Sequence, residues 1–292
     1  MIPKEVLQKV RRIEIKTRSI VDSILSGEYH SVFKGRGMEF SEVRTYTEGD
    51  DIRNIDWNVT ARMREPFVKK HVEERELTMM LLVDASASGT FGTTNKFKGE
   101  MAVELCALLA FSAIKNNDRV GLINFTSEVE SFIPPKKGKN HVLRVIRELL
   151  YLQPQHKGTD IGAALKYLNQ VQTKKAVVFL VSDFISPTYE TALRIAARKH
   201  DLIAISLQDP RERVMPDVGL IEFEDAETGA TMLIDSGSAE FRDRYKKEMD
   251  RRRNETTSIF KSNGVDEILV STETDYVEPL VRFFRKREKM IR

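Results

Sequence analysis

Short, continuously apolar segments alternate with segments of helical periodicity through the middle of the chain. An apolar strand without alternating polar residues is buried on both faces, and a helix between two such strands makes a right-handed parallel crossover. The predicted strands are residues 78–84, 119–125, 176–182 and 202–207, and the predicted helices are residues 97–115, 140–150, 161–171 and 189–199. This pattern predicts an α/β fold with a doubly wound, mostly parallel sheet.

The regions on either side of this pattern differ from it. Apolar residues three and four apart predict an amphipathic N-terminal helix, whose basic face we expect to be solvated. The stretch that follows mixes charges and aromatics without a clear period, and we expect it to form a small β subdomain with a later hairpin whose turn is at 226–229. A long helix, a strand and a last helix complete the fold. The predicted regions are 1–27, 28–76, 77–208 and 209–292, with the hairpin at 214–235, the long helix at 239–261, the strand at 267–271 and the last helix from 276.

Composition limits the classes of function. The chain has 292 residues, of which 41% are hydrophobic and 31% charged, so it can bury a core and is not disordered. A formal charge of +3 does not require a polyanionic partner, and we expect no nucleic-acid binding. The single cysteine, Cys106, excludes an intrachain disulfide, and its apolar surroundings predict a core thiol. Because we find neither a secretory signal nor a membrane-spanning apolar run, we expect a cytoplasmic location.

Carboxylates and hydroxyls follow the predicted strands at the points where those strands end. The candidate ligands are Asp84, Ser86, Ser88, Thr159 and Asp183. In an open α/β sheet, ligands bind at the carboxyl ends of the strands. An all-oxygen set without His or Cys is typical of a hard divalent cation such as Mg²⁺, Mn²⁺ or Ca²⁺. Each residue alone is equally well explained as a turn residue or a helix cap, but their joint position favours a metal site.

These five positions resemble the metal-ion-dependent adhesion site of von Willebrand factor A domains, in which DxSxS is followed by a distant Thr and then a distant Asp. The segment upstream resembles the signature of a bacterial family, the domain of unknown function number fifty-eight. The matching positions are Gly35, Arg36, Gly37, Glu39, Phe40, Arg44, Tyr46, Gly49, Asp50, Asp51, Arg53, Ile55, Asp56, Trp57, Ala61 and Arg62. The resemblance extends from about residue 35 to about residue 238, and GDDxRxIDW followed by AR is its most specific part.

The resemblance implies a mechanism as well as a family. In the adhesion site the hydroxyls bind the cation directly, an Asp acts through water, and one coordination position stays open for an Asp or Glu carboxylate of a partner protein. Genes of the family often neighbour those of MoxR-type AAA+ ATPases. The expected function is therefore a non-enzymatic, metal-dependent protein–protein interaction module, an adaptor for such an ATPase, with Mg²⁺ as the expected cofactor.

Two other classes of function remain open in the sequence. A metal-dependent hydrolase or phosphatase would use Asp84 with His156 as general base. However, haloacid-dehalogenase-type phosphatases carry a second Asp at the position that Ser86 occupies here. The basic C-terminal tail, which includes Phe283 and Phe284, leaves open a peripheral contact with a membrane or a membrane-bound partner.

The GDDIRNIDW segment has two interpretations of its own. Asp50, Asp51 and Asp56 are either a second carboxylate cluster for a metal or the acidic half of an ion-pair network with nearby arginines. We predict the ion-pair network, packed around Trp57, because unpaired buried charges are costly.

Overall fold

The computed structural model describes residues 4–21, 32, 39–72, 76–93, 96–186, 188–224 and 229–291. The chain divides into two compact units. Residues 1–32 and 78–292 form the larger unit, and residues 33–77 form the smaller one. The two units are described separately below.

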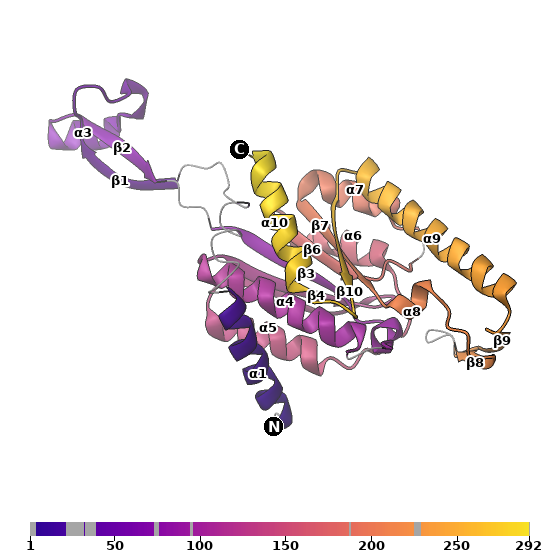
Figure 1. The fold of residues 1–292 in the computed structure, drawn as a ribbon. Coiled ribbons are helices and arrows are strands. Elements are labelled where there is room, and N and C mark those ends of the chain that lie inside the picture. Colours follow the sequence, from indigo (N-terminus) through magenta and orange to yellow (C-terminus); the bar gives the residue numbers. More distant parts are fainter. Residues whose placement is uncertain are drawn as a thin grey trace. The chain divides into compact units, whose positions relative to one another are not determined.

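A six-stranded sheet forms the centre of the larger unit in its described residues (Figure 1). The strand order is β10-β7-β6-β3-β4-β5, in which the pair β4–β5 is antiparallel and the other neighbouring pairs are parallel. The bounds are β3 Thr78–Asp84, β4 Arg119–Phe125, β5 Val129–Lys136, β6 Val177–Ser182, β7 Asp201–Gln208 and β10 Asp266–Ser271. This confirms the predicted α/β fold class with a doubly wound and mostly parallel sheet.

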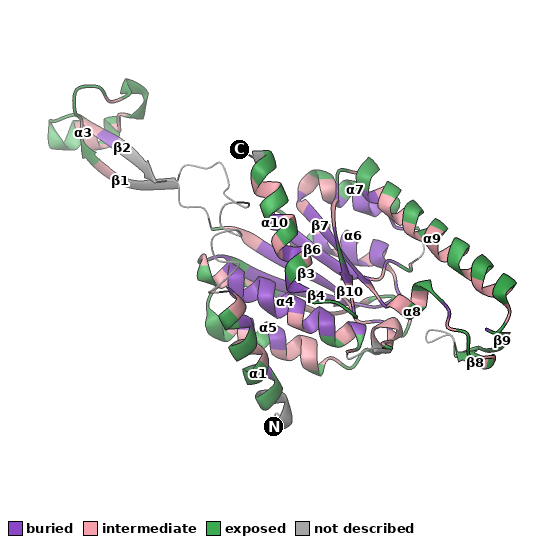
Figure 2. Ribbon diagram, in the orientation of Figure 1, coloured by how far each residue is buried: buried purple, intermediate pink, exposed green. Residues whose placement is uncertain are grey.

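Helices cover both faces of this sheet, and its strands are buried between them (Figure 2). Helices α6 and α7 pack against the face to which Met80 and Leu82 of β3 point. Helices α4 and α5 lie on the other face, where α1 packs against both (Figure 1). Cys106 of α4 is fully buried, so the prediction of a core thiol is confirmed. The bounds are α1 Lys4–Ile20, α4 Lys98–Lys115, α5 Lys139–Tyr151, α6 Ile161–Val171 and α7 Glu190–Lys199.

The edge strand β5 was not expected from the sequence. It contains Pro134 and Pro135, and proline weakens a strand prediction because it cannot donate to a ladder. The structure accommodates both residues because β5 pairs on one side only, with β4, at the end of the sheet. The register of β5 against β4 shifts between Val120 and Leu122 of β4, opposite the two prolines.

The smaller unit contains two antiparallel strands, β1 Glu39–Thr45 and β2 Phe67–Val72, with the short helices η2 Ile52–Asn54 and α3 Trp57–Met63 between them. It contains the whole GDDIRNIDW segment, whereas residues 35–37 of the signature lie outside the described residues.

The acidic residues of this segment agree with the prediction in part, because two of them pair with arginines. Arg44 donates to both carboxylate oxygens of Asp50 at 2.8 and 2.6 Å and thereby lowers the pKa of Asp50 to about 2. Asp51 and Asp56 also accept from backbone N–H groups and thereby cap η2 and α3, and the Asp51 carboxylate lies 3.9 Å from the Arg53 guanidinium. Trp57 is 67% exposed, so an ion-pair network packed around it is not formed. A unit of this size has too little interior to enclose both an indole and its charged neighbours.

The predicted hairpin is present as β8 Leu220–Glu224 and β9 Thr231–Asp235, and residues 225–228 of its turn lie outside the described residues. These strands form a sheet of their own in the larger unit, whereas β1 and β2 form a separate sheet in the smaller unit. The expected joint β subdomain therefore differs from what the described residues form. The reason is local, since β1 pairs with the next strand in the chain, β2, and β8 pairs with β9, so that each pair satisfies its own ladder.

The C-terminal elements complete the larger unit. They are α8 Pro210–Arg213, α9 Ala239–Ser262 and α10 Val277–Ile291. Phe260 of α9 is buried against Phe184 with ring centroids 4.8 Å apart. In α10, Phe284 is fully buried and Arg287 forms an ion pair with Asp201, so part of the basic tail is bound to the protein itself.

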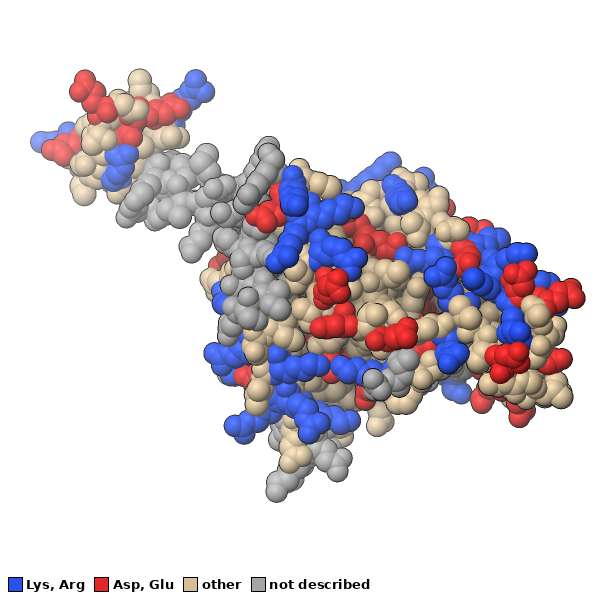
Figure 3. Space-filling view, in the orientation of Figure 1, with Lys and Arg blue, Asp and Glu red and all other residues tan. Residues whose placement is uncertain are grey.

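Some basic residues of α9 are paired with acidic residues of the same helix. Figure 3 shows Lys and Arg mixed with Asp and Glu over this region. Arg251 pairs with Glu248 and Glu255, and Arg252 also pairs with Glu248. Among the described residues, no helix is long and apolar enough to cross a membrane.

One buried histidine predicts that stability depends on pH. His200 is 3% exposed at the end of α7, and burial, together with the nearby Lys199, lowers its pKa to about 4. The unfolded chain, in which histidine titrates near 6.5, therefore binds the proton first as pH falls. We expect this group's contribution to be fully present above pH 6.5 and about 1–3 kcal/mol to be lost as pH falls towards 4. Denaturant titrations at pH 7 and 4.5 check this, and His200→Gln with the same pH dependence as the wild type would contradict it.

Candidate metal site

The ends of β3 and β6 bring the two predicted carboxylates to one edge of the sheet. Val83 of β3 is level with Val181 of β6, so the residues that follow each of them are also neighbours. Ser182 donates through Oγ to Asp84 Oδ2 at 2.6 Å, and Asp183 comes next in the chain. Parallel strands end at the same edge of a sheet, which explains how side chains about 100 residues apart meet here.

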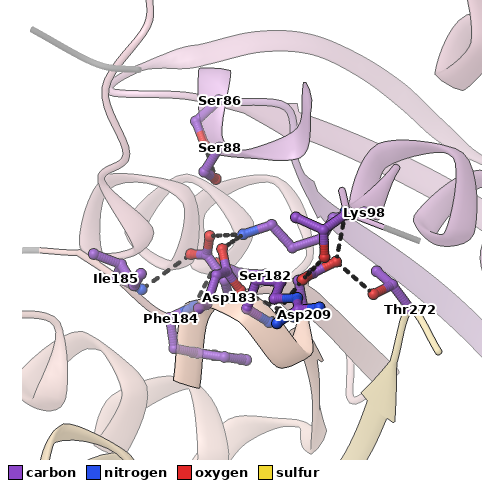
Figure 4. Close-up of polar contacts among 12 residues, drawn as sticks. Ser86, Ser88, Lys98, Ser182, Asp183, Phe184, Ile185, Asp209 and Thr272 are labelled. Atoms are coloured by element: carbon purple, nitrogen blue, oxygen red, sulfur yellow. Dashed lines mark hydrogen bonds and ion pairs between the residues drawn. The ribbon is translucent and has the colours of Figure 1, made fainter. Parts of the chain in front are cut away.

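The loop after β3 directs its hydroxyls to the same side. Ser86 N–H donates to Asp84 Oδ1 at 2.9 Å and closes a tight turn, and the hydroxyls of Ser86 and Ser88 are 3.0 Å apart. Figure 4 shows both side chains extending from the loop towards the side on which Asp183 lies. Ser86 precedes a short 3-10 helix but makes no side-chain cap, so capping does not account for its hydroxyl.

Thr159 lies on a loop that is tied to this turn. Ala87 N–H donates to the carbonyl of Lys157 at 3.1 Å, which joins the two loops two residues before Thr159. Thr159 is 5% exposed, and its carbonyl accepts from the hydroxyl of Ser186 in the loop after β6. The cap of α6 is Asp160, which accepts from Ala163 N–H, so Thr159 is not needed as the side-chain cap of this helix.

The electrostatics of the two carboxylates favour a bound cation. Burial, and next the charge of Asp183, raise the pKa of Asp84 to about 6. Hydrogen bonds from Ser182 and Ser86 act against this rise without cancelling it. Two carboxylates that repel each other beside two hydroxyls match the donors that hard divalent cations take. The donor set therefore fits such an ion.

Sequence reasoning missed a lysine in this site. Lys98, the first residue of α4, is 2% exposed, and its Nζ lies 2.8 Å from Asp183 Oδ2 and 2.5 Å from Glu212 Oε1. In Figure 4 its side chain reaches across to Asp183. Burial acts to lower the pKa of Lys98, but Asp183 and Glu212 outweigh it and raise the pKa above its ordinary value. The sequence offered one indication that Lys98 is special. It stands at the start of a predicted helix, where the helix macrodipole disfavours a cation.

The backbone after Asp183 has an unusual conformation. Phe184 has a φ of +61°, in the left-handed region that residues other than glycine rarely adopt. Its N–H donates to the hydroxyl of Ser182 at 3.0 Å, the hydroxyl that also binds Asp84. Ser182 therefore couples the backbone geometry after β6 to the carboxylate at the end of β3, and this kind of local strain is concentrated at functional sites.

Two hollows flank the site. Asp84 and Ser86 line one of about 360 Å³, whose other walls are mostly apolar and include Phe97 and Leu152. Asp183 lines the other, of about 740 Å³. The site therefore lies between two concave surfaces.

His156, the general base of the alternative hydrolase, has another partner. Its Nδ1 lies 3.1 Å from Glu130 Oε1, and its backbone N–H donates to the same oxygen at 3.0 Å. Burial acts to raise the pKa of Glu130, but the hydrogen bonds from Thr126, Gln155 and His156 lower it to about 2. These contacts give His156 a structural role in holding its loop to β5.

Known proteins resemble this chain over much of its length. A family described as "Protein of unknown function DUF58" matches residues 42–255. An uncharacterised protein of Mycobacterium tuberculosis H37Rv is 29% identical over 283 residues, which are 96% of this chain and 89% of that protein. An uncharacterised protein of Mycobacterium avium is 26% identical over 162 residues, 54% of this chain and 94% of that protein.

Solved structures resemble the fold at low sequence identity. An aerotolerance-related membrane protein of Bacteroides fragilis has a TM-score of 0.50 at 16% identity, covering 73% of this chain and 99% of that chain. Proximal thread matrix protein 1 of the mussel byssus, with a zinc-occupied MIDAS motif, has a TM-score of 0.37 at 20% identity, covering 46% and 38%.

Proposed function

Because the chain belongs to the DUF58 family, proteins of unknown function, we propose its activity from the site itself: a metal-dependent protein–protein interaction module. Asp84, Ser86, Ser88, Thr159 and Asp183 hold a divalent cation, with Mg²⁺ the expected ion and Mn²⁺ or Ca²⁺ the alternatives. When bound, the cation supplies a coordination position for an Asp or Glu carboxylate of the partner.

One observation carries this proposal more than any other. The side chains of Asp84 and Ser86 after β3 and of Asp183 after β6 meet at one sheet edge, where burial, and next the charge of Asp183, raise the pKa of Asp84 to about 6. A folded protein gains no stability from holding two such charges together. The arrangement is explained if a cation resides between them, since this converts the repulsion into attraction.

The proposed partner is a MoxR-type AAA+ ATPase, for which this protein acts as an adaptor. The support is the family resemblance, because the ATPases are often encoded beside members of the family. A cytoplasmic location belongs to the same proposal and is favoured by the single, buried Cys106, which fits a reducing compartment.

Affinity capture with the full chain tests this function. Wild type and Ser86→Ala are used as bait in Mg²⁺ and in EDTA, and the captured proteins are identified by mass spectrometry. We expect an AAA+ ATPase with wild type in Mg²⁺, reduced at least tenfold by EDTA or by Ser86→Ala, because the open coordination position is lost with the ion. Thr231→Ala, which changes a hydroxyl on the distant hairpin, serves as the matched control. Recovery of the ATPase that is indifferent to EDTA and to Ser86→Ala would contradict the proposal.

A further inference from the structure

Lys98 brings a positive charge into the candidate metal site itself. Its position is unfavourable in two ways, since a helix N-terminus repels a cation and a side chain only 2% exposed loses its hydration. The compensation comes from two carboxylates, at 2.8 Å on Asp183 and 2.5 Å on Glu212. A lysine is retained here at an energetic cost that an apolar residue would not have.

The same lysine occupies a carboxylate that the proposed cation needs. Asp183 Oδ2 accepts from Lys98, and Asp183 Oδ1 accepts from Ile185 N–H at 3.1 Å. By contrast, Asp84 accepts from two uncharged donors, the Ser86 N–H and the Ser182 hydroxyl. A divalent cation that binds both carboxylates must therefore compete with the Lys98 ammonium at Asp183. At Asp84 it displaces only uncharged donors.

Glu212 provides a second place for the ammonium. It lies in α8, where its Oε2 accepts from Asp209 N–H at 3.0 Å, and its carbonyl accepts from the hydroxyl of Tyr245 in α9 at 2.9 Å. Glu212 is therefore held firmly and points its other oxygen at Lys98. An ammonium that leaves Asp183 keeps a counter-ion, which makes the exchange less costly than exposing an unpaired buried charge.

We propose that Lys98 is an internal competitor of the divalent cation: it neutralises Asp183 in the cation-free protein and is retained by Glu212 alone when the cation binds. This inference rests on the proposed function, because it concerns the same site. The competition holds the cation affinity below that of the oxygen ligands alone. It also ties cation loading to α8 and α9 through Glu212, so that the state of the site is communicated to elements outside it.

Two substitutions with opposite expected signs test this inference on the full chain. Lys98→Met keeps the length of the side chain and removes its charge, so we expect Mg²⁺ and Mn²⁺ to bind at least tenfold more tightly by calorimetry. In EDTA the same protein should unfold at a lower temperature than the wild type and recover when Mg²⁺ is added, because Asp183 and Glu212 are left unpaired. Glu212→Gln confines the ammonium to Asp183, and we expect at least threefold weaker cation binding.

The outcomes separate this inference from the proposed function. Lys166→Met, an exposed lysine of α6, is the matched control and should bind cation as the wild type does. A purely structural ion pair would make Lys98→Met and Glu212→Gln weaken binding alike, and unchanged or weaker binding in Lys98→Met overturns the inference while leaving the metal site in place. If the wild type itself binds neither Mg²⁺ nor Mn²⁺, the proposed function fails and the inference fails with it.

Discussion

Asp84→Ala is expected to reduce Mg²⁺ and Mn²⁺ affinity at least a hundredfold, about 2.7 kcal/mol, while the protein remains folded. Asp84 is the carboxylate whose two oxygens are positioned by Ser86 and Ser182, so its removal takes away both a ligand and the charge that attracts the ion. Isothermal titration calorimetry measures the affinity, and circular dichroism measures the retained fold.

Asp84→Asn sharpens this prediction. In EDTA at pH 8 the wild type holds Asp84 ionised against its raised pKa of about 6, which opposes folding. The amide removes this charge, so we expect the variant to lose cation binding and yet to be as stable as the wild type or about 1–2 kcal/mol more stable. Asp160→Asn, which keeps a cap on α6 at the same sheet edge, should change neither quantity. Cation binding by Asp84→Ala equal to that of wild type would refute the site assignment.

Asp209→Ala is expected to lower the free energy of unfolding by about 3 kcal/mol or more. Asp209 is 1% exposed and accepts four hydrogen bonds, from Thr93 N–H, the Thr93 hydroxyl, Arg211 N–H and the Thr272 hydroxyl. Burial acts to raise its pKa, but these donors outweigh it and lower the pKa below the ordinary range. Alanine leaves the donors without an acceptor and weakens the turn that presents Glu212 to Lys98.

Denaturant titration checks this value. Asp217→Ala removes an acidic residue that is 65% exposed and paired with Arg242, and we expect less than about 0.5 kcal/mol from it. Thr272→Val removes one donor together with its hydrogen bond and should cost about 1 kcal/mol. Losses of equal size in all three variants would show that the buried carboxylate has no special role.

The candidate ligand positions were accessible to sequence reasoning because strand ends determine them. Asp84 and Asp183 each stand directly after or at the end of a continuously apolar strand, and parallel strands end at one edge, so no long-range information was needed to bring them together. The same local rule predicted the four central strands and the helices between them. It holds because the local hydrophobic pattern and the global fold agree there.

The partners of those ligands were not accessible in this way. Lys98 and Glu212 meet across 114 positions of sequence, and one lysine among 47 Lys and Arg residues carries no mark of its burial. The prediction for Trp57 was wrong in the opposite sense. An aromatic residue in a motif suggests burial in a core, whereas Trp57 is 67% exposed. Tertiary context decides both, and local propensity does not report it.

The two prolines of β5 have a consequence for how copies of this protein meet. The outer edge of a sheet exposes donors and acceptors on which a strand from another molecule can add, and this is a route to uncontrolled aggregation. Pro134 and Pro135 remove N–H donors from the edge that β5 forms. Strand addition along this side is therefore disfavoured in the crowded conditions of a cell, which leaves the concave rim at the strand ends as the better surface for selective contact.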